Sequence, residues 1–156
     1  FIKLLMDLDK LIKGIELLNK DTLPNWGKMN SSMMLKHCSA FIDVYLNKTK
    51  LNPLIFLVGF IFGVFHRLYL KYIVRYNVKN YIKNLPTLKV FNTYRSENLD
   101  FEFEKNKLIN DLKEVESINK KYLLNNFHGI VPNKAFKKVV YFHTSYHLYQ
   151  FDVYKT

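Results

Sequence analysis

Apolar residues recur at steps of three and four along most of this chain, and this spacing constrains its fold more than any other feature. In the first segment the apolar positions are Ile2, Leu5, Leu8, Ile12, Ile15 and Leu18. Such a period places them on one face of an α-helix. Segments predicted as helices in this way span 2–19, 31–48, 54–85, 99–119 and 134–153. The sequence therefore predicts an all-α fold, and its length predicts a single domain over residues 1–156.

Turn-forming residues separate the predicted helices. The first helix must end before Pro24, and the second must end before Pro53. Asn30 or Ser31 can cap the start of the second helix. In the same way Asn133 can cap the last helix.

Two stretches lack a helical period. They are "NLPTLKVFNTYRSEN" (84–98) and "NNFHGIVPN" (125–133), and both are expected to be irregular, apart from a weak strand tendency in 86–94. The third helix is expected to be interrupted near Asn77. This organisation fits an antiparallel bundle of four main helices with a long crossover connection and accessory segments.

Composition limits the partners. The formal net charge of +11 suits an anionic partner, but the excess of Lys, Asn, Ile, Phe and Tyr is also what AT-rich codons favour, so both causes stay open. No nucleic-acid-binding motif accompanies the charge, and no specific nucleic acid is expected. The single cysteine, Cys38, excludes an internal disulfide and fits a reducing compartment, so a cytoplasmic location is expected. Whether the chain forms a homodimer is left open.

The segment "LIFLVGFIFGVF" (54–65) is wholly apolar. It is too short to span a bilayer, and charged residues follow it, so no transmembrane segment is expected. We expect a buried core helix in which Gly59 and Gly63 permit close approach by a neighbour. A peripheral membrane contact is the alternative. The cations that follow at four-residue steps are Arg67, Lys71, Arg75, Lys79 and Lys83, either a solvated basic face or a site for an anionic partner.

Two histidines of the last predicted helix, His143 and His147, stand four residues apart. They share an i, i+4 row with Val139 and Phe151, which mark that row as the buried face. His37 lies on the apolar face of the second helix. A single buried histidine is usually a hydrogen-bonded core residue, but three without a shared partner would leave several hydrogen bonds unmet. Together they favour a divalent metal site, for which imidazole suits Zn, Ni or Fe.

Four motifs resemble those of a branch of the DinB/YfiT-like superfamily. "PNWGKMNSSMMLKHC" (24–38) resembles its W-G-K-M-x-x-x-x-M-L-x-H signature, and "HTSYHLYQF" (143–151) is similar to its closing H-x-x-H-H-L-x-Q-F. Between them, "KNLPT" (83–87) and "DFEFEKNKL" (100–108) resemble the loop and helix that the branch carries there. The likeness covers nearly the whole chain, in order.

The resemblance implies a DinB/YfiT-like four-helix bundle in which His37, His143 and His147 hold a divalent metal. Tyr146 stands where the branch has the first of two adjacent histidines, and it is not an expected ligand. "HGIVPNKAF" replaces the usual H-P-x-F-G, and only His128 matches. The substrate role of this loop is therefore open.

Three further residues are candidates for the pocket or for contacts to the ligands. Trp26 either plugs one end of the bundle or walls the pocket, His128 matches the family loop, and Gln150 can be a polar partner of a ligand histidine. Cys38 is predicted to be a small buried residue, rather than a nucleophile or a fourth ligand. On the fourth helix the residues expected to face water are Glu102, Glu104, Lys105, Asp111 and Lys113.

Three hypotheses for function follow. Three protein ligands leave coordination positions open, as in catalytic sites, which favours a metal-dependent enzyme; hydrolases and thiol S-transferases are the types that the resemblance implies. Its small-molecule substrate is not indicated. The alternative is a non-catalytic protein that binds a metal or a small ligand through the same histidines. A peripheral membrane or polyanion binder is the third hypothesis, and burial of 54–65 would count against its membrane form.

Overall fold

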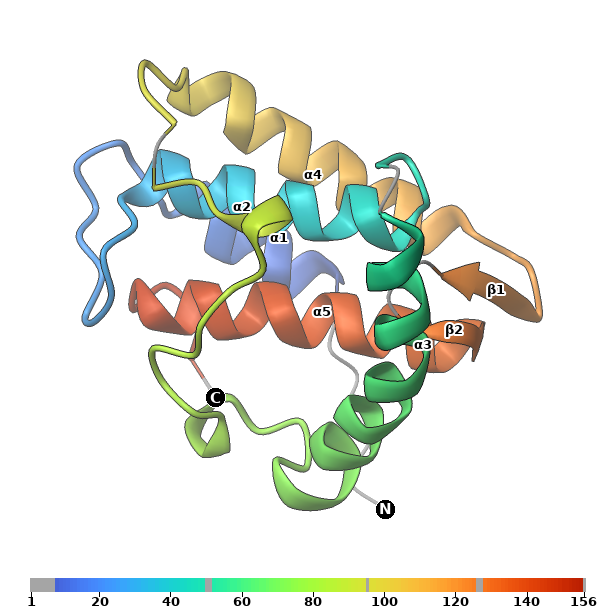
Figure 1. Ribbon diagram of the computed structural model, residues 1–156. Helices are drawn as coiled ribbons and strands as arrows, with labels where there is room; N and C mark the ends of the chain where they lie inside the picture. Colours follow the sequence, from blue (N-terminus) through green and yellow to red (C-terminus); the bar gives the residue numbers. More distant parts are fainter. Residues whose placement is uncertain (1–7, 50–51, 95, 126–127, 156) are drawn as a thin grey trace.

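The protein is mostly helical in the computed structural model, which describes residues 8–49, 52–94, 96–125 and 128–155 (Figure 1). Its α-helices are α1 (Leu8–Glu16), α2 (Ser31–Tyr45), α3 (Pro53–Leu68), α4 (Phe101–Ser117) and α5 (Asn133–Gln150). A π-helical turn, Tyr69–Ile73, continues α3, and 3₁₀ turns occupy Val78–Asn80 and Lys89–Phe91. Positions 2–7 of the first predicted helix, including Ile2 and Leu5, lie outside the described residues. The prediction of a largely helical fold is confirmed.

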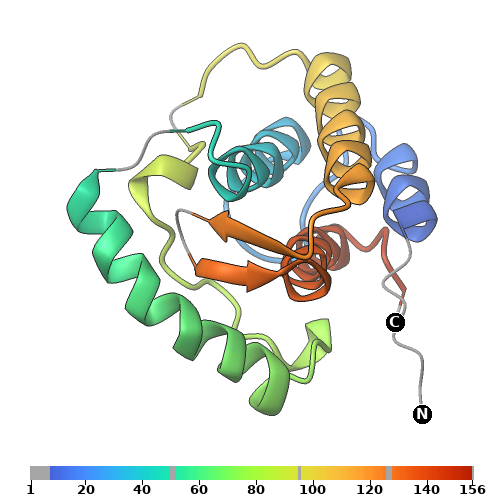
Figure 2. The same ribbon diagram turned by 90° about the vertical axis from the view of Figure 1, so that its right-hand side faces the viewer.

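Four of the helices pack around one apolar core. α2 packs on α4 and α5, and α1 packs on the same two helices, so that each of the four contacts two others. Figure 2 shows these helices grouped together, with α3 running along the outside. The fully buried side chains of this core include Leu11, Leu35, Ile42, Leu108, Leu112 and Leu148. Whether the arrangement is a DinB/YfiT-like bundle stays a prediction.

Asparagine and aspartate side chains cap several helices. The side chain of Asn30 accepts a hydrogen bond of 2.9 Å from the amide of Met33, which confirms one of the two predicted caps of α2. At the start of α5 the prediction is wrong. Pro132 occupies the capping position, and Asn133 instead donates from Nδ2 to the carbonyl of Ile118 at 2.8 Å.

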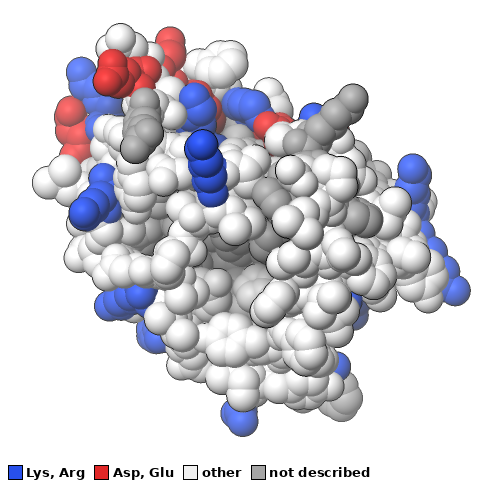
Figure 3. Space-filling model, in the orientation of Figure 1, with Lys and Arg blue, Asp and Glu red and all other residues white. Residues whose placement is uncertain are grey.

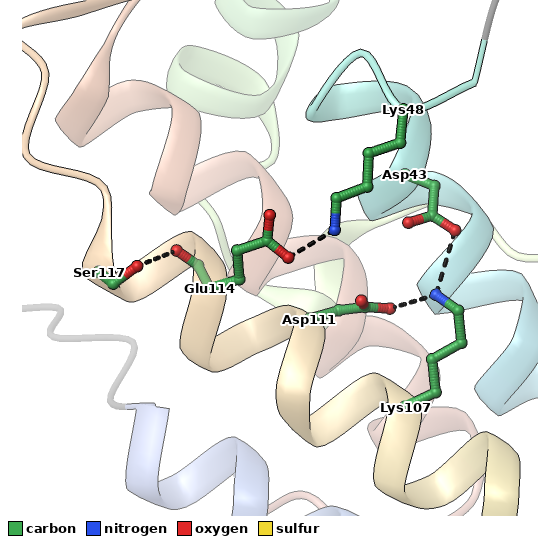
Figure 4. Close-up of polar contacts among 6 residues, drawn as sticks. All are labelled: Asp43, Lys48, Lys107, Asp111, Glu114 and Ser117. Carbon is green, nitrogen blue, oxygen red and sulfur yellow. Dashed lines mark hydrogen bonds and ion pairs between the residues drawn. The ribbon is translucent and has the colours of Figure 1, made fainter.

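Ion pairs join α2 to α4 (Figure 4). Lys107 bridges Asp43 of α2 at 3.1 Å and Asp111 of α4 at 2.7 Å. Burial lowers the pKa of Lys107, but its hydrogen bonds to the two carboxylates outweigh burial and raise it. Asp111 is therefore buried against its cation, not turned to water as expected. Glu104 is also buried, which corrects a second expectation for this helix.

A β-hairpin occupies the loop that was expected to be irregular. Its antiparallel strands are β1 (Tyr122–Asn125) and β2 (Gly129–Pro132), and Leu123 pairs with Val131. The weak strand tendency in 86–94 is wrong, because the described part of that connection contains a 3₁₀ turn and no strand.

The third helix is interrupted near Asn77, as predicted, but no α-helix resumes after the break in the described residues before α4, so the helix is shorter than expected. Arg75 and Tyr76, just after the π-helical turn, have φ angles of 56° and 52°, which a helix cannot contain. The predicted row of five cations is consequently interrupted beyond Lys71. Within the described ranges, no helix combines the length and the apolar character needed to cross a bilayer.

The expected burial of 54–65 is wrong for the side chains that the structure describes, which leave out those of residues 55 and 56. Gly59 and Gly63 are buried, but the larger described side chains around them face outward, and the close approach of a neighbour at these glycines stays a prediction. Leu57 is 59%, Ile61 53% and Phe65 64% exposed. α3 packs mainly on β2 and on the turn that follows it, away from the main core.

Candidate metal centre

Three histidines from two helices come together where α2 crosses α5. His37 projects from α2, and His143 and His147 project from successive turns of α5. Their ring centroids lie 5.1 Å (His37–His143), 4.7 Å (His37–His147) and 4.8 Å (His143–His147) apart. One nitrogen from each ring lies within 4.8 Å of the other two. The fold thus gathers the three candidate ligands identified in the sequence.

Hydrogen bonds select one nitrogen in two of these rings. Nδ1 of His37 lies 2.7 Å from the carbonyl oxygen of Phe91, so it is the N–H donor. Nδ1 of His147 lies 2.9 Å from Oε1 of Gln150 and donates to it in the same way. Each ring then keeps the lone pair of Nε2 for a ligand. This pattern, in which one nitrogen is held and the other left with its lone pair, is typical of metal-ligating histidines.

His143 is held by stacking. Its ring lies 3.9 Å from that of Phe41 with an interplanar angle of 9°. Its Nδ1 is buried and has no hydrogen-bond partner among the described residues. A buried polar nitrogen without a partner costs free energy, and a metal ion or a ligand at this position would satisfy it.

The electrostatics of the cluster favour neutral imidazoles. Burial and, after it, the nearby His37 lower the pKa of His147 to about 3, although the bond to Gln150 opposes the change. For His143, burial holds the pKa well below its usual range, and His147 and His37 add to this effect. Burial also lowers the pKa of His37, although its bond to the Phe91 carbonyl opposes the change. Neutral imidazole is the form that binds metals.

The three histidines line a cavity of about 860 Å³. Its walls come from the loop before α2, from α2, α3 and α5, and from the connection between α3 and α4. Aromatic side chains dominate the lining, among them Trp26, Phe41, Phe62, Phe65, Tyr69 and Phe91. Figure 3 shows the surface hollowed near the centre of this view. A cavity of this size accommodates a small organic molecule next to the histidines.

A second polar group stands at the cavity wall, and sequence reasoning missed it. His66, near the end of α3, lines the cavity, and its Nδ1 lies 3.1 Å from Nε2 of His128. His128 in turn bonds the hydroxyl of Tyr45, and its carbonyl accepts a 2.6 Å bond from Arg67. Burial, then Arg67, lowers the pKa of His66. The only sequence signal was a histidine directly after an apolar run.

His128 lies one layer behind the cavity. It does not appear among the cavity-lining residues of the described chain, and its amide and ring are bonded to Asn125 and Tyr45. Burial, His66 and Arg67 lower the pKa of His128 to about 2. His128 could therefore influence the cavity only through His66, and its predicted role in the pocket stays a prediction.

Gln150 connects the cluster to the loop before α2. While Oε1 accepts from His147, Nε2 donates to the carbonyl of Trp26 at 2.5 Å. Gly27 makes this contact possible, because its φ is +87° and a Cβ there would lie 2.5 Å from Nε2. Trp26 itself is half-buried, packs edge-on against Tyr149 and lines the cavity.

Cys38 is fully buried, and its Sγ lies 3.8 Å from Sδ of Met34. Burial raises the pKa of the Cys38 thiol, so it stays protonated and is a poor nucleophile. The structure agrees with its prediction as a small core residue.

Comparison with known proteins gives no relative for this site. No family model, curated protein or solved structure matches the chain.

Proposed function

We propose that this protein is a metal-dependent enzyme, of the hydrolase or thiol S-transferase type, in which His37, His143 and His147 hold a divalent ion. The observation that carries the proposal is the convergence of three neutral imidazoles, one with a buried unbonded nitrogen, at the wall of a large cavity. The resemblance to the DinB/YfiT-like branch supports the reaction types.

The donor set fits a borderline ion such as Zn, Ni or Fe. Around a tetrahedral ion with bonds of about 2.0–2.1 Å, ligand atoms lie roughly 3.3 Å apart. The spread of 4.8 Å is somewhat wider, so small side-chain rotations would bring the three nitrogens onto one ion. Three ligands leave positions open toward the cavity, as catalytic sites require.

A divalent ion at this place supplies a Lewis acid and lowers the pKa of a bound water or thiol. The chain's own residues would do the rest. His66 is neutral because its pKa is lowered, so it can accept a proton at the cavity wall. The aromatic lining would exclude water from an organic substrate.

Metal content tests the site. We expect about one equivalent of metal in the wild-type protein, and loss of it in a His143→Ala, His147→Ala double variant that keeps its helical circular dichroism. His66→Ala is the matched control, because it removes a cavity imidazole outside the ligand trio. Equal metal content in the wild type and in the double variant would exclude the site.

Cobalt substitution tests whether the site is open. If the coordination positions face the cavity, added azide or a small thiol changes the visible spectrum of the Co²⁺ protein. A spectrum that does not respond to either ligand would favour the alternative, a non-catalytic metal-binding protein.

A further inference from the structure

The outer side of α3 carries an apolar stripe that nothing in the described chain covers. The stripe consists of Leu54, Leu57, Val58, Ile61, Val64 and Leu68, all of them exposed. They recur at steps of three and four and therefore share one face of the helix. The inward side is made by Gly59, Gly63 and the half-buried His66. An exposed apolar face of this length on a soluble domain marks an interaction surface.

Cations gather at the C-terminal end of the stripe. We call Lys71, Lys134 and Lys138 the cation cluster. Lys71 follows α3 directly, and the other two lie in the first turns of α5. Nζ of Lys138 lies 4.1 Å from the centroid of the Tyr76 ring, three residues after the π-helical turn that carries Lys71, so α5 brings its cations to this end of α3. In keeping with this, the charges of Lys134 and Lys71 add to burial in lowering the pKa of Lys138. None of the three has an ion-pair partner among the described residues.

Cations also outnumber acidic residues in the whole stretch of sequence around α3. From residue 44 to residue 96 the sequence has no Asp or Glu. The same stretch carries the cations Lys48, Lys50, Arg67, Lys71, Arg75, Lys79, Lys83, Lys89 and Arg95. Figure 3 shows the acidic side chains in the upper part of the view, while the described residues of the lower part, into which α3 descends in Figure 1, are cations or uncharged.

We propose that α3 docks on the surface of an anionic phospholipid bilayer, with the apolar stripe in the interface and the cation cluster on the lipid headgroups. A helix of 16 residues is about 24 Å long, shorter than the hydrocarbon core of roughly 30 Å, so it lies on the bilayer and does not cross it. A bilayer offers acyl chains and anionic headgroups side by side, which matches a stripe next to a cluster.

A second copy of the chain fits this surface less well. A symmetric dimer places the same patch opposite itself, so the cation cluster would face either itself or other cations of this acid-free stretch. Nucleic acid would satisfy the cations, but it would leave the apolar stripe in water.

Vesicle binding tests the proposal. The full protein is mixed with vesicles of phosphatidylcholine containing phosphatidylglycerol, or with vesicles of phosphatidylcholine alone, and the bound fraction is measured by sedimentation. We expect strong binding to the first and weak binding to the second. Raising the salt from about 0.1 M to about 1 M shortens the Debye length from about 10 Å to about 3 Å, so binding should fall.

Two sets of substitutions separate the stripe from the cluster. Replacing Leu57, Ile61 and Leu68 by Gln should abolish sedimentation, whereas Leu17→Gln with Leu23→Gln, at two exposed leucines outside α3, should not change it. Replacing Lys71, Lys134 and Lys138 by Gln should weaken binding roughly a hundredfold, at about 1 kcal/mol for each cation near an anionic surface. All of these side chains are exposed or half-buried, and unchanged circular dichroism would verify each fold.

Equal binding to both kinds of vesicle, or full binding by the Leu57, Ile61 and Leu68 variant, would overturn the proposal. So would light scattering that shows a stable dimer lost in that variant, without any vesicle binding, because the stripe would then be a contact between copies. Metal content is independent of these results, so the proposed metal centre stands or fails separately.

Discussion

At the scale of single residues, Gln150 connects a candidate metal ligand, His147, to the loop before α2. Both polar atoms of its side-chain amide are used: the oxygen accepts from His147 and the nitrogen donates to the Trp26 carbonyl. The bond to His147 fixes which ring nitrogen faces the cavity. Contacts of this kind to a ligand histidine contribute about 10–100-fold in metal affinity.

We therefore predict that Gln150→Met lowers metal affinity about 10–100-fold, because Nδ1 of His147 loses its acceptor. Gln150→Glu keeps an oxygen at the same place and should retain most of the affinity. Competition with a chromophoric chelator measures both constants. If the Met and Glu variants bind metal equally well, the hydrogen bond does not orient the ring.

The inward faces of the candidate ligands could be read from the sequence. Val139 and Phe151, which bracket His143 and His147 in an i, i+4 row, are buried as that row requires. The hydrogen bond from His37 to the carbonyl of Phe91 could not be predicted. Phe91 lies in a connection that has no helical or strand period, and the path of such a segment depends on tertiary packing. His66 was missed for a related reason: a single histidine gives no spacing to interpret.

At the scale of elements, Lys107 forms ion pairs with one carboxylate of α2 and one of α4 and so links the two helices. Removing it would leave Asp111 buried without its cation, and Asp43 without its partner across the interface. We predict that Lys107→Met lowers the free energy of unfolding by about 1–3 kcal/mol, as expected when a buried polar group loses its partner.

Urea denaturation followed by circular dichroism measures this change. Lys113→Met, on the exposed side of the same helix, is the control and should stay within about 0.5 kcal/mol of the wild type. Adding Asp111→Leu to Lys107→Met should restore part of the loss. Equal midpoints for the two lysine variants would mean that the ion pairs contribute nothing.

Helices with a long apolar period were predictable, and short or interrupted elements were not. β1 and β2 have four residues each, too few for alternation to stand out from chance. An interruption of the third helix near Asn77 was predicted. That no α-helix resumes in the described stretch directly after Arg75 and Tyr76, which take positive φ angles, was not, because neither residue type signals such angles. Tertiary contacts decide both features.

At the scale of the whole molecule, the histidines make stability depend on pH. All five have pKa values lowered by burial in the folded chain. Between these values and 6.5 the unfolded chain binds more protons than the folded chain. The free energy of unfolding of the metal-free protein is therefore highest above about pH 6.5 and falls as the pH drops.

We predict a loss of up to about 1.4 kcal/mol per pH unit for each histidine that titrates in this way. Urea midpoints measured in the presence of a chelator, from about pH 7.5 down to about pH 5, test the slope. Bound metal keeps the ligand imidazoles unprotonated in the folded chain, so the metal-loaded protein should have a higher midpoint at each pH, while its midpoint falls with pH at least as steeply. A midpoint of the metal-free protein that stays constant below pH 6.5 would contradict the prediction.

The position of α3 shows where composition misleads. Buried residues are mostly apolar, but the converse does not hold, because a folded surface also contains many apolar atoms. Nothing in 54–65 distinguishes a core helix from one that faces a partner, because both are apolar. The choice depends on how many neighbours the rest of the chain supplies.

The layout of the proposed metal centre also determines when an ion could be captured. His37 lies in the second helix, whereas His143, His147 and Gln150 lie in the last, and Gln150 bonds a carbonyl 124 residues earlier. The ribosome releases the chain from its N-terminal side. His37 is therefore exposed to cellular ions long before its companions exist, and one imidazole retains them weakly. If the three histidines hold an ion, loading follows the emergence of α5, so metal supply after translation, not during it, would set the fraction of holoprotein.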